Sequence, residues 1–342
     1  MKKLWIFLFA GLFLMGGLAA QAGAEKTTFL LDWIIFGKHA PFFAAQDFGF
    51  YKKVGLDVVY KRGFGSGRTI KDIAAKVANI GFADAASLVN ARANNPDIKI
   101  KVIAMGHAKT IMNAFFLKEK GYKHPKDLAG AKIGSPVGNA VRVIFPAFAA
   151  ANGLNPCSIK WIDMPYGQVT PAMLTGQIDV ALWYATEVPK QIESAKKIGK
   201  EMAWFSYGDY GVKVYNNGII VREDTIASDP EFVRNAVKAN QEAWAWSLIH
   251  PDKAIQNFFK YAPAMSKHII RGQFAIAIEY LFDEGVRRHG LGYMDHDKMD
   301  KTVELLTTLG KLKKRIPTGD MYTNRFLPQW PDLKAALGDK VM

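Results

Sequence analysis

The sequence predicts an α/β fold arranged as two lobes of similar topology. Three observations support this prediction. Short apolar runs rich in β-branched residues alternate with helical patterns, as in βαβ units. Two short segments recur 98 residues further along the chain. The length of 342 residues is enough for about two domains, each with its own core.

The alternation places the elements in order along the chain. Strands are predicted at residues 28–32, 56–61, 80–82, 100–105, 132–134, 159–162, 180–183 and 202–205. Helices are predicted at residues 69–77, 87–93, 140–152, 169–174 and 188–197. Residues 226–312 follow a mostly helical pattern, which begins with Ser228 as N-cap, Pro230 in the first turn and Glu231 three residues after the cap.

The internal repeat is short. Gly55-Leu56 before one predicted strand matches Gly153-Leu154 before another, and the segment around Ile80 matches the segment around Ile178. Two copies of one strand and helix order indicate two related lobes with a ligand between them.

Composition excludes several classes of protein. With 49% hydrophobic and 12% aromatic residues the chain is too apolar to be disordered. The only cysteine, Cys157, excludes an intrachain disulfide and a CxxC metal site. A formal net charge of +14 leaves nucleic acid, an anionic membrane or an anionic small ligand as partners.

The N-terminus suggests the compartment. Lys2 and Lys3 precede an apolar run, and Ala22-Gly23-Ala24 ends it with an A-x-A cleavage pattern. Residues 1–24 are therefore predicted to be a signal peptide. The alternative, a transmembrane anchor, needs roughly 20 apolar residues, more than this run has. The mature chain is then expected in the periplasm, without a lipid anchor because no cysteine follows the run. Nucleic acid is not expected as a partner there, and the positive charge is interpreted as solvated surface.

Several motifs together resemble a known family, the periplasmic substrate-binding proteins of ABC transporters that bind sulfonates, nitrate, taurine or thiamine-pyrimidine precursors. They comprise Leu31-Asp32-Trp33, His39, the block from Ala44 to Val58, the turn from Gly63 to Gly67, Ile80-Gly81-Phe82-Ala83-Asp84, the run from Asp127 to Gly134, and Gly176-Gln177-Ile178-Asp179-Val180-Ala181. The similarity extends over residues 28–250, and its Asp-Trp version points to the pyrimidine branch.

The resemblance implies a two-lobed periplasmic-binding-protein fold of the second type, in which each lobe is a mixed sheet flanked by helices. Lobe one would comprise residues 25–112 and 213–342, and lobe two residues 113–212, with hinge crossovers near residues 112–117 and 214–219. It also implies a monomer that passes a small molecule to an inner-membrane ABC permease, with no cofactor.

Ligands of such sheets bind beyond the carboxyl ends of strands, so the residues that follow predicted strands are the site candidates. In lobe one these are Trp33, Phe36, His39, Ser66 and Ser87. Trp33 offers a stacking face for a flat ring or else covers the core. His39 either donates to the ligand or is structural, and Ser87 either faces the cleft or caps a helix. The glycines around Ser66 either leave helix-start N–H groups free for an anion or form a tight turn with positive φ.

Lobe two supplies the opposite face of the predicted site. The candidates are Val137, Gly138, Asn139, Tyr166, Trp183, Tyr184 and Glu187, with Tyr210 and Asn217 near the second crossover. Glu187 matches the acidic residue of the family and is expected to accept hydrogen bonds from an amino-substituted ring. The alternative is a carboxylate favoured by the helix dipole alone.

Enzyme motifs are missing from the sequence. No H-E-x-x-H, no G-x-S-x-G and no histidine cluster occurs, and Asp295-His296-Asp297 is interpreted as a helix cap. Pyrimidine-synthase relatives of the family carry a cysteine cluster that this chain lacks. We therefore expect a binding protein with no catalytic residue and no metal. An organic anion remains the alternative ligand, bound at the helix starts with Arg68 or Arg142.

Overall fold

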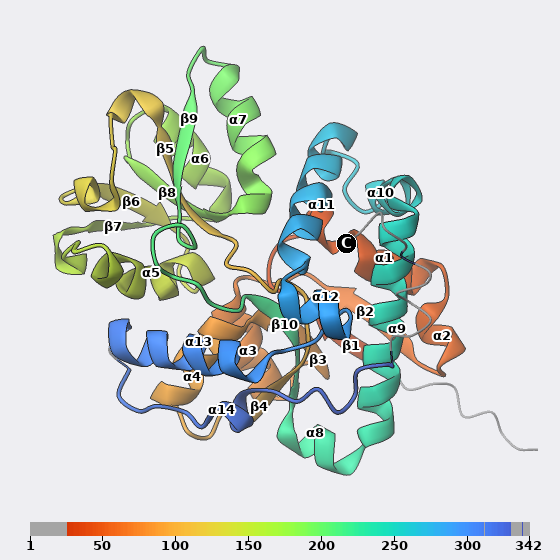
Figure 1. Cartoon of the computed structure of the whole chain (residues 1–342). Coiled ribbons are helices and arrows are strands. Elements are labelled where there is room, and N and C mark those ends of the chain that lie inside the picture. Colours follow the sequence, from red (N-terminus) through yellow and green to blue (C-terminus); the bar gives the residue numbers. More distant parts are fainter. Residues whose placement is uncertain (1–25, 311, 330–336, 338–342) are drawn as a thin grey trace, which may run out of the picture.

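Two five-stranded mixed sheets form the two lobes of the molecule (Figure 1). The structure is a computed structural model that describes residues 26–310, 312–329 and 337, so the predicted signal peptide lies outside the described residues. The strand order is β2-β1-β3-β10-β4 in the first sheet and β7-β6-β8-β5-β9 in the second. We call the first sheet and its helices lobe one, and the second sheet and its helices lobe two.

In each sheet three parallel strands lie side by side, an antiparallel strand comes next, and the fifth strand, at the edge, runs antiparallel to that one. The strands of lobe one are β1 (Lys26–Leu30), β2 (Asp57–Lys61), β3 (Ile80–Asp84), β4 (Ile100–Met105) and β10 (Asn217–Arg222). Those of lobe two are β5 (Met112–Leu117), β6 (Lys132–Ser135), β7 (Lys160–Asp163), β8 (Val180–Tyr184) and β9 (Met202–Ser206). β10 is antiparallel to β3 and β4, and β5 is antiparallel to β8 and β9. The two lobes therefore share one topology, as the repeat predicts.

Helices cover both faces of the sheets. Those of the first half are α1 (Ala40–Asp47), α2 (Phe50–Lys53), α3 (Ser66–Ala74), α4 (Ala85–Asn94), α5 (Ala140–Ala151), α6 (Tyr166–Leu174) and α7 (Val188–Lys196). The last third is helical as predicted, with α8 (Glu223–Ser228), α9 (Pro230–Ile249), α10 (Pro251–Phe259), α11 (Lys267–Leu281), α12 (Glu284–His289), α13 (His296–Leu309) and α14 (Thr318–Met321). α9 packs on α1 and α2 of lobe one (Figure 1).

The repeated Gly-Leu pair follows the C-terminal end of a helix in each lobe, α2 in lobe one and α5 in lobe two. Gly55 and Gly153 both have positive φ, 76° and 65°. The N–H of the following leucine donates five residues back, from Leu56 to the Tyr51 carbonyl and from Leu154 to the Ala149 carbonyl. This is the Schellman arrangement, which needs a residue without a Cβ at the left-handed position.

The second repeated segment also has one structural role in both lobes, but at a different spacing. β3 begins at Ile80 and β8 at Val180, so the offset is 180 − 80 = 100 residues rather than 98. The Asn79 side chain accepts from the Thr28 N–H, and the Asp179 side chain accepts from the Lys132 N–H. Each side chain thereby joins the start of one parallel strand to the neighbouring parallel strand, β3 to β1 in lobe one and β8 to β6 in lobe two.

The lobes are joined by two crossovers, residues 106–111 and 207–216, which hydrogen-bond to each other. Thr110 Oγ1 lies 2.8 Å from the Val212 carbonyl and accepts from the Val214 N–H at 2.8 Å. The predicted hinge at residues 112–117 is wrong in position, since these residues form β5 with every side chain buried. Met112 already pairs in lobe two. The residue boundaries of the lobes otherwise remain predictions.

Helix starts differ from the prediction in two places. Asp229, not Ser228, caps α9, because its carboxylate accepts from the Phe232 N–H. α4 is capped by Asp84, whose carboxylate accepts from the Ser87 N–H, so Ser87 is not a cap. Asp295 caps α13 through the Lys298 N–H, which confirms that interpretation.

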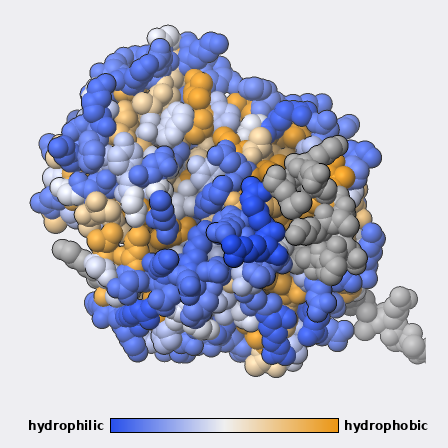
Figure 2. All heavy atoms as spheres, viewed as in Figure 1, coloured by the Kyte–Doolittle hydropathy of each residue, from blue (hydrophilic) through white to orange (hydrophobic). Residues whose placement is uncertain are grey.

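The surface is hydrophilic over α12 and carries apolar side chains in a strip near β9 and α7 (Figure 2). Ile192 and Ile198 are among the exposed large hydrophobic residues. Among the described residues, no helix combines the length and the hydrophobicity that crossing a membrane requires.

Candidate functional site

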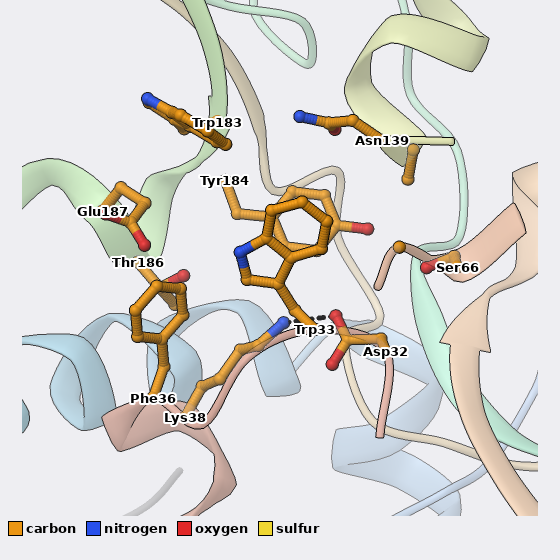
Figure 3. Close-up of a pocket in the computed structure, with 12 residues that line it drawn as sticks. Asp32, Trp33, Phe36, Lys38, Ser66, Asn139, Trp183, Tyr184, Thr186 and Glu187 are labelled. Atoms are coloured by element: carbon orange, nitrogen blue, oxygen red, sulfur yellow. Dashed lines mark hydrogen bonds and ion pairs between the residues drawn. The ribbon is translucent and has the colours of Figure 1, made fainter. Parts of the chain in front are cut away.

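A pocket lies between the lobes, beyond the carboxyl ends of β1, β6 and β8 (Figure 3), and its empty space is about 370 Å³ when the part open to solvent is included. Lobe one contributes Asp32, Trp33, Phe36, Lys38, Gly65 and Ser66 to its lining, and lobe two contributes Asn139, Ala140, Trp183, Tyr184, Thr186 and Glu187. Both sheets therefore present the strand ends at which α/β proteins bind small molecules.

Aromatic rings from both lobes meet at this pocket. The indole of Trp33 lies 6.2 Å from that of Trp183 and 5.8 Å from the ring of Tyr166, centroid to centroid. Tyr166 also lies 5.8 Å from Phe36 and 5.0 Å from Trp183. These separations are typical of tilted and edge-to-face pairs, and the rings give the pocket flat apolar walls.

A buried charged group forms one wall of the pocket. The Lys38 ammonium lies 2.5 Å from Asp32 Oδ2, and both side chains are almost completely buried. His39 Nε2 lies 2.8 Å from Asp32 Oδ1, while its Nδ1 accepts from the Phe36 N–H. Burial alone would raise the pKa of Asp32, but the Lys38 charge and the His39 hydrogen bond hold it well below its usual value. Asp32 is thus ionised and neutralised by Lys38.

Lys38 also reaches lobe two. Its ammonium lies 4.7 Å from the ring centroid of Tyr184, on the far side of the pocket. A cation over an aromatic ring at this distance is attractive, more so when it is desolvated. The contact therefore favours the closed arrangement of the lobes.

Glu187 is the second carboxylate of the pocket, and it has only weak partners within the chain. The side chain is 2% exposed. Its oxygens lie 3.3 and 3.4 Å from the Tyr166 hydroxyl, which itself accepts from Lys190 Nζ at 2.6 Å. Burial raises the pKa of Glu187, although Lys190 and Tyr166 oppose this shift. Such long contacts leave acceptor capacity for a ligand.

Two further polar atoms of lobe two are buried without a hydrogen-bond partner among the described residues. They are Nε1 of Trp183 and the hydroxyl of Tyr184. Buried polar groups are almost always paired in folded proteins. Together with Glu187, they give the lobe-two side donors and an acceptor for a polar ligand.

The lobes touch at two glycines beside the pocket. A Cβ on Gly65 would lie 2.5 Å from the Gly138 carbonyl oxygen, and Gly65 has φ of 113°. A side chain at position 65 would be strained by the positive φ and would collide with the Gly138 backbone, so this position requires glycine. The tight-turn interpretation of residues 63–67 is the correct one for this position.

The sequence-predicted residues divide into three groups. Those that line the pocket are Trp33, Phe36, Ser66, Asn139, Trp183, Tyr184 and Glu187. Val137 and Tyr166 line a groove at the mouth of the cleft, and Gly138 forms the contact just described. The remaining four, His39, Ser87, Tyr210 and Asn217, lie outside the pocket.

Each of these four has a different place in the fold. Both ring nitrogens of His39 form hydrogen bonds within lobe one, which fits the structural role considered for it in the sequence analysis. Ser87 and Asn217 are buried away from the pocket, with no partner for the Ser87 hydroxyl. Tyr210 packs on Phe205 and Phe148 in lobe two.

Asn139, which lines the pocket, uses its side chain to cap α5 and to donate to the Leu182 carbonyl.

Asp32 and Lys38 line the pocket and were not among the predicted site residues. A signal was present, because Lys38 is the only lysine, arginine or carboxylate in the otherwise apolar stretch from Trp33 to Ala45. A lysine in such a run is buried only with a partner. Asp32, six residues earlier, could have been named as that partner.

Asp84 lies behind the pocket at the end of β3 and is fully buried. Its carboxylate accepts from the Ser87 N–H at 2.5 Å and from Asn216 Nδ2 at 2.7 Å. Burial raises the pKa of Asp84 to about 7, because these bonds only partly offset desolvation. The folded state therefore holds this proton more tightly than the unfolded chain.

Replacement of Asp84 by asparagine is expected to change how stability depends on pH. Between about pH 4 and pH 7 the unfolded chain loses the Asp84 proton and the folded chain keeps it, so this residue makes stability fall as pH rises. As pH rises across this window, the free energy of unfolding of the Asp84→Asn variant should increase relative to that of the wild type by up to about 1.4 kcal/mol per pH unit. Urea unfolding at pH 5 and pH 7.5 measures the difference, and a constant difference at both values would contradict the prediction.

Comparison with known proteins places the chain in a family. The model of the family described as "NMT1/THI5 like" matches residues 37–254, well over half of the chain. The chain belongs to this family. The match includes Lys38, Glu187 and most of both lobes.

Relatives with curated names match most of the chain. The riboflavin-binding protein RibY of Chloroflexus aurantiacus is 26% identical over 90% of this chain and 88% of its own. The formylaminopyrimidine-binding protein of Halalkalibacterium halodurans is 21% identical, over 68% of this chain and 69% of its own. A Saccharomyces cerevisiae enzyme, 4-amino-5-hydroxymethyl-2-methylpyrimidine phosphate synthase THI13, is 22% identical over 90% of this chain and 89% of its own.

Solved structures show the same fold. The alkanesulfonate-binding protein SsuA of Xanthomonas axonopodis pv. citri, bound to MOPS, superposes with a TM-score of 0.68 at 11% identity, over 88% of this chain and 99% of that chain. The predicted periplasmic-binding-protein fold is thereby confirmed.

Proposed function

We propose that this chain is the periplasmic solute-binding component of an ABC importer and captures a small, flat, amino-substituted heterocycle, of the kind of a thiamine-pyrimidine precursor. The observation that carries the proposal is Glu187, a buried carboxylate with only long contacts to its own chain, beside aromatic rings from both lobes. A ring amino group donates to such a carboxylate while the ring lies against the indoles.

The charges around the pocket favour this ligand over an organic anion. Lys38 is the only cationic residue among the described residues that line the pocket, and Asp32 neutralises it. Arg68 pairs with Asp72 and Arg142 with Asp163, and neither lines the pocket. The lining thus offers an anion no unpaired cationic side chain, which disfavours a sulfonate or nitrate.

Similarity to relatives supports a heterocycle and adds a second candidate. The formylaminopyrimidine-binding relative bears a name that fits the pyrimidine proposal. The RibY similarity, which covers more of the chain, favours a flavin as the second candidate. Both ligands are flat rings with polar edges, and both suit the walls of the pocket.

Binding without turnover is the second part of the proposal. The yeast synthase is a relative, yet this chain has only Cys157, which is exposed on the surface. No cluster of three or more potential metal ligands occurs within the described ranges. Hinge movement at residues 106–111 and 207–216 would close the lobes over the ligand, which binds the closed state more tightly.

A ligand screen of the purified mature protein tests the proposal. Thermal unfolding is measured with an aminopyrimidine, riboflavin, taurine, methanesulfonate and nitrate, followed by calorimetry and chromatography of the recovered ligand. A cognate ligand at 100 times its Kd should stabilise the protein by about 2.7 kcal/mol. Stabilisation by the aminopyrimidine supports the first candidate ligand. Stabilisation by riboflavin and not by the aminopyrimidine supports the second. Response to sulfonate without response to either heterocycle, or chemical conversion of a ligand, would overturn the proposal.

A further inference from the structure

A groove at the mouth of the cleft adjoins the pocket and is not explained by binding of a small ring. It is lined by Trp33, Phe64 and Arg62 of lobe one and by Val137 and Tyr166 of lobe two, among others. It encloses about 930 Å³ including its open side, against about 370 Å³ for the inner pocket. Trp33 lines both spaces, so they adjoin at this residue.

The walls of the groove are apolar side chains that face solvent from opposite lobes. Phe64 is 61% exposed and Val137 is 72% exposed. Large apolar residues on both lips of one opening are typical of a binding surface rather than of ordinary exterior. Because the lips belong to different lobes, the groove is complete only when the lobes are closed.

Arg62 gives the groove its charge. Its guanidinium lies over the Phe64 ring at 4.4 Å and has no carboxylate partner among the described residues. Among the described residues that line the groove it is the only cation, and none of them is a carboxylate. Stacking on an aromatic face leaves the edge of a guanidinium free to bind an oxyanion with two hydrogen bonds.

We infer that this groove is a second subsite that holds an anionic substituent of the ligand, of the phosphate-ester class, while the ring occupies the inner pocket. The inference rests on the proposed function. The inner pocket provides a carboxylate for the ring edge, and the mouth provides an unpaired guanidinium for the opposite end, so the two charges fix one orientation of the ligand. Contact of the substituent with both lips also favours closure.

Calorimetry with matched ligand pairs tests the inference on the full mature chain. The pairs are 4-amino-5-hydroxymethyl-2-methylpyrimidine with its phosphate, and riboflavin with riboflavin 5′-phosphate. In each pair that binds, the phosphate should bind about tenfold more tightly than the alcohol in the wild type. Arg62→Gln should abolish this preference and leave the affinity for the alcohol unchanged, and Arg62→Lys should retain only part of it.

Arg68→Gln is the matched control. It removes the same charge from an exposed arginine six residues away that pairs with Asp72 and does not line the groove. This variant should keep the phosphate preference. Equal affinity for alcohol and phosphate in the wild type, or equal losses in the Arg62 and Arg68 variants, would overturn the inference and leave the proposed function standing. Failure of all four compounds to bind would overturn both.

Discussion

Replacement of Lys38 by methionine is expected to destabilise the folded protein by about 3–5 kcal/mol. The variant leaves the Asp32 carboxylate buried with His39 as its remaining side-chain partner, since Lys38 Nζ and Asp32 Oδ2 are 2.5 Å apart in the wild type. The loss arises from an uncompensated buried charge rather than from the removal of a favourable pair. Urea unfolding at neutral pH measures it.

Two further variants separate this cause from a general packing defect. The double variant Asp32→Asn with Lys38→Met removes both charges and should recover part of the lost stability. Lys118→Met breaks the pair of Lys118 with Glu201, which has the same 2.5 Å separation but is exposed, so it should cost less than about 1 kcal/mol. Similar losses of stability for Lys38→Met and Lys118→Met would contradict the prediction, because burial would then not increase the cost of breaking the pair.

Replacement of Glu187 by glutamine is expected to weaken binding of an aminopyrimidine by about 1.5–3 kcal/mol, roughly 10–150-fold in Kd. Glutamine has the same shape but lacks the charge that strengthens a hydrogen bond from a ring amino group. Calorimetry with the aminopyrimidine measures the loss. The free protein should keep or raise its thermal midpoint, because a buried carboxylate with long contacts is costly to hold.

Glu193→Gln serves as the control for that measurement. Glu193 lies on α7, the helix that begins directly after Glu187, and pairs with Lys197 on the surface. Ligand affinity should be unchanged in this variant. Unchanged affinity in Glu187→Gln would show that Glu187 is structural, and so would a loss of affinity matched by an equal loss of thermal stability.

Much of the fold was predictable because it depends on local pattern. Short apolar runs rich in β-branched residues located every strand of lobe two except β5, and β4 matched the predicted residues 100–105 in full. The repeated glycines marked helix ends that require positive φ, at Gly55 and Gly153. β5 and the first half of β10 were instead predicted to belong to the hinge, near residues 112–117 and 214–219. Their entry into the sheets depends on pairing between residues about a hundred positions apart, as between Gly218 and Met105.

The site was predictable in part for the same reason. Residues that follow strands meet at one sheet edge, so position, together with the family resemblance, predicted that Trp33, Trp183 and Glu187 lie at the pocket they line. Local position does not reveal which polar atoms are already satisfied. His39 is occupied by Asp32 and Phe36, while the Trp183 Nε1 has no partner among the described residues.

The sequence by itself determined the two related lobes, the family resemblance and the aromatic residues at the strand ends, because each of these is written in spacing and residue type. Only the tertiary structure decided the electrostatics of the site. The neutralisation of Lys38 by Asp32, the weakly paired carboxylate of Glu187 and the unpaired guanidinium of Arg62 all depend on distances between side chains in the folded chain. Burial then sets their energies, since a charge removed from water is stabilised only by the partners within its reach.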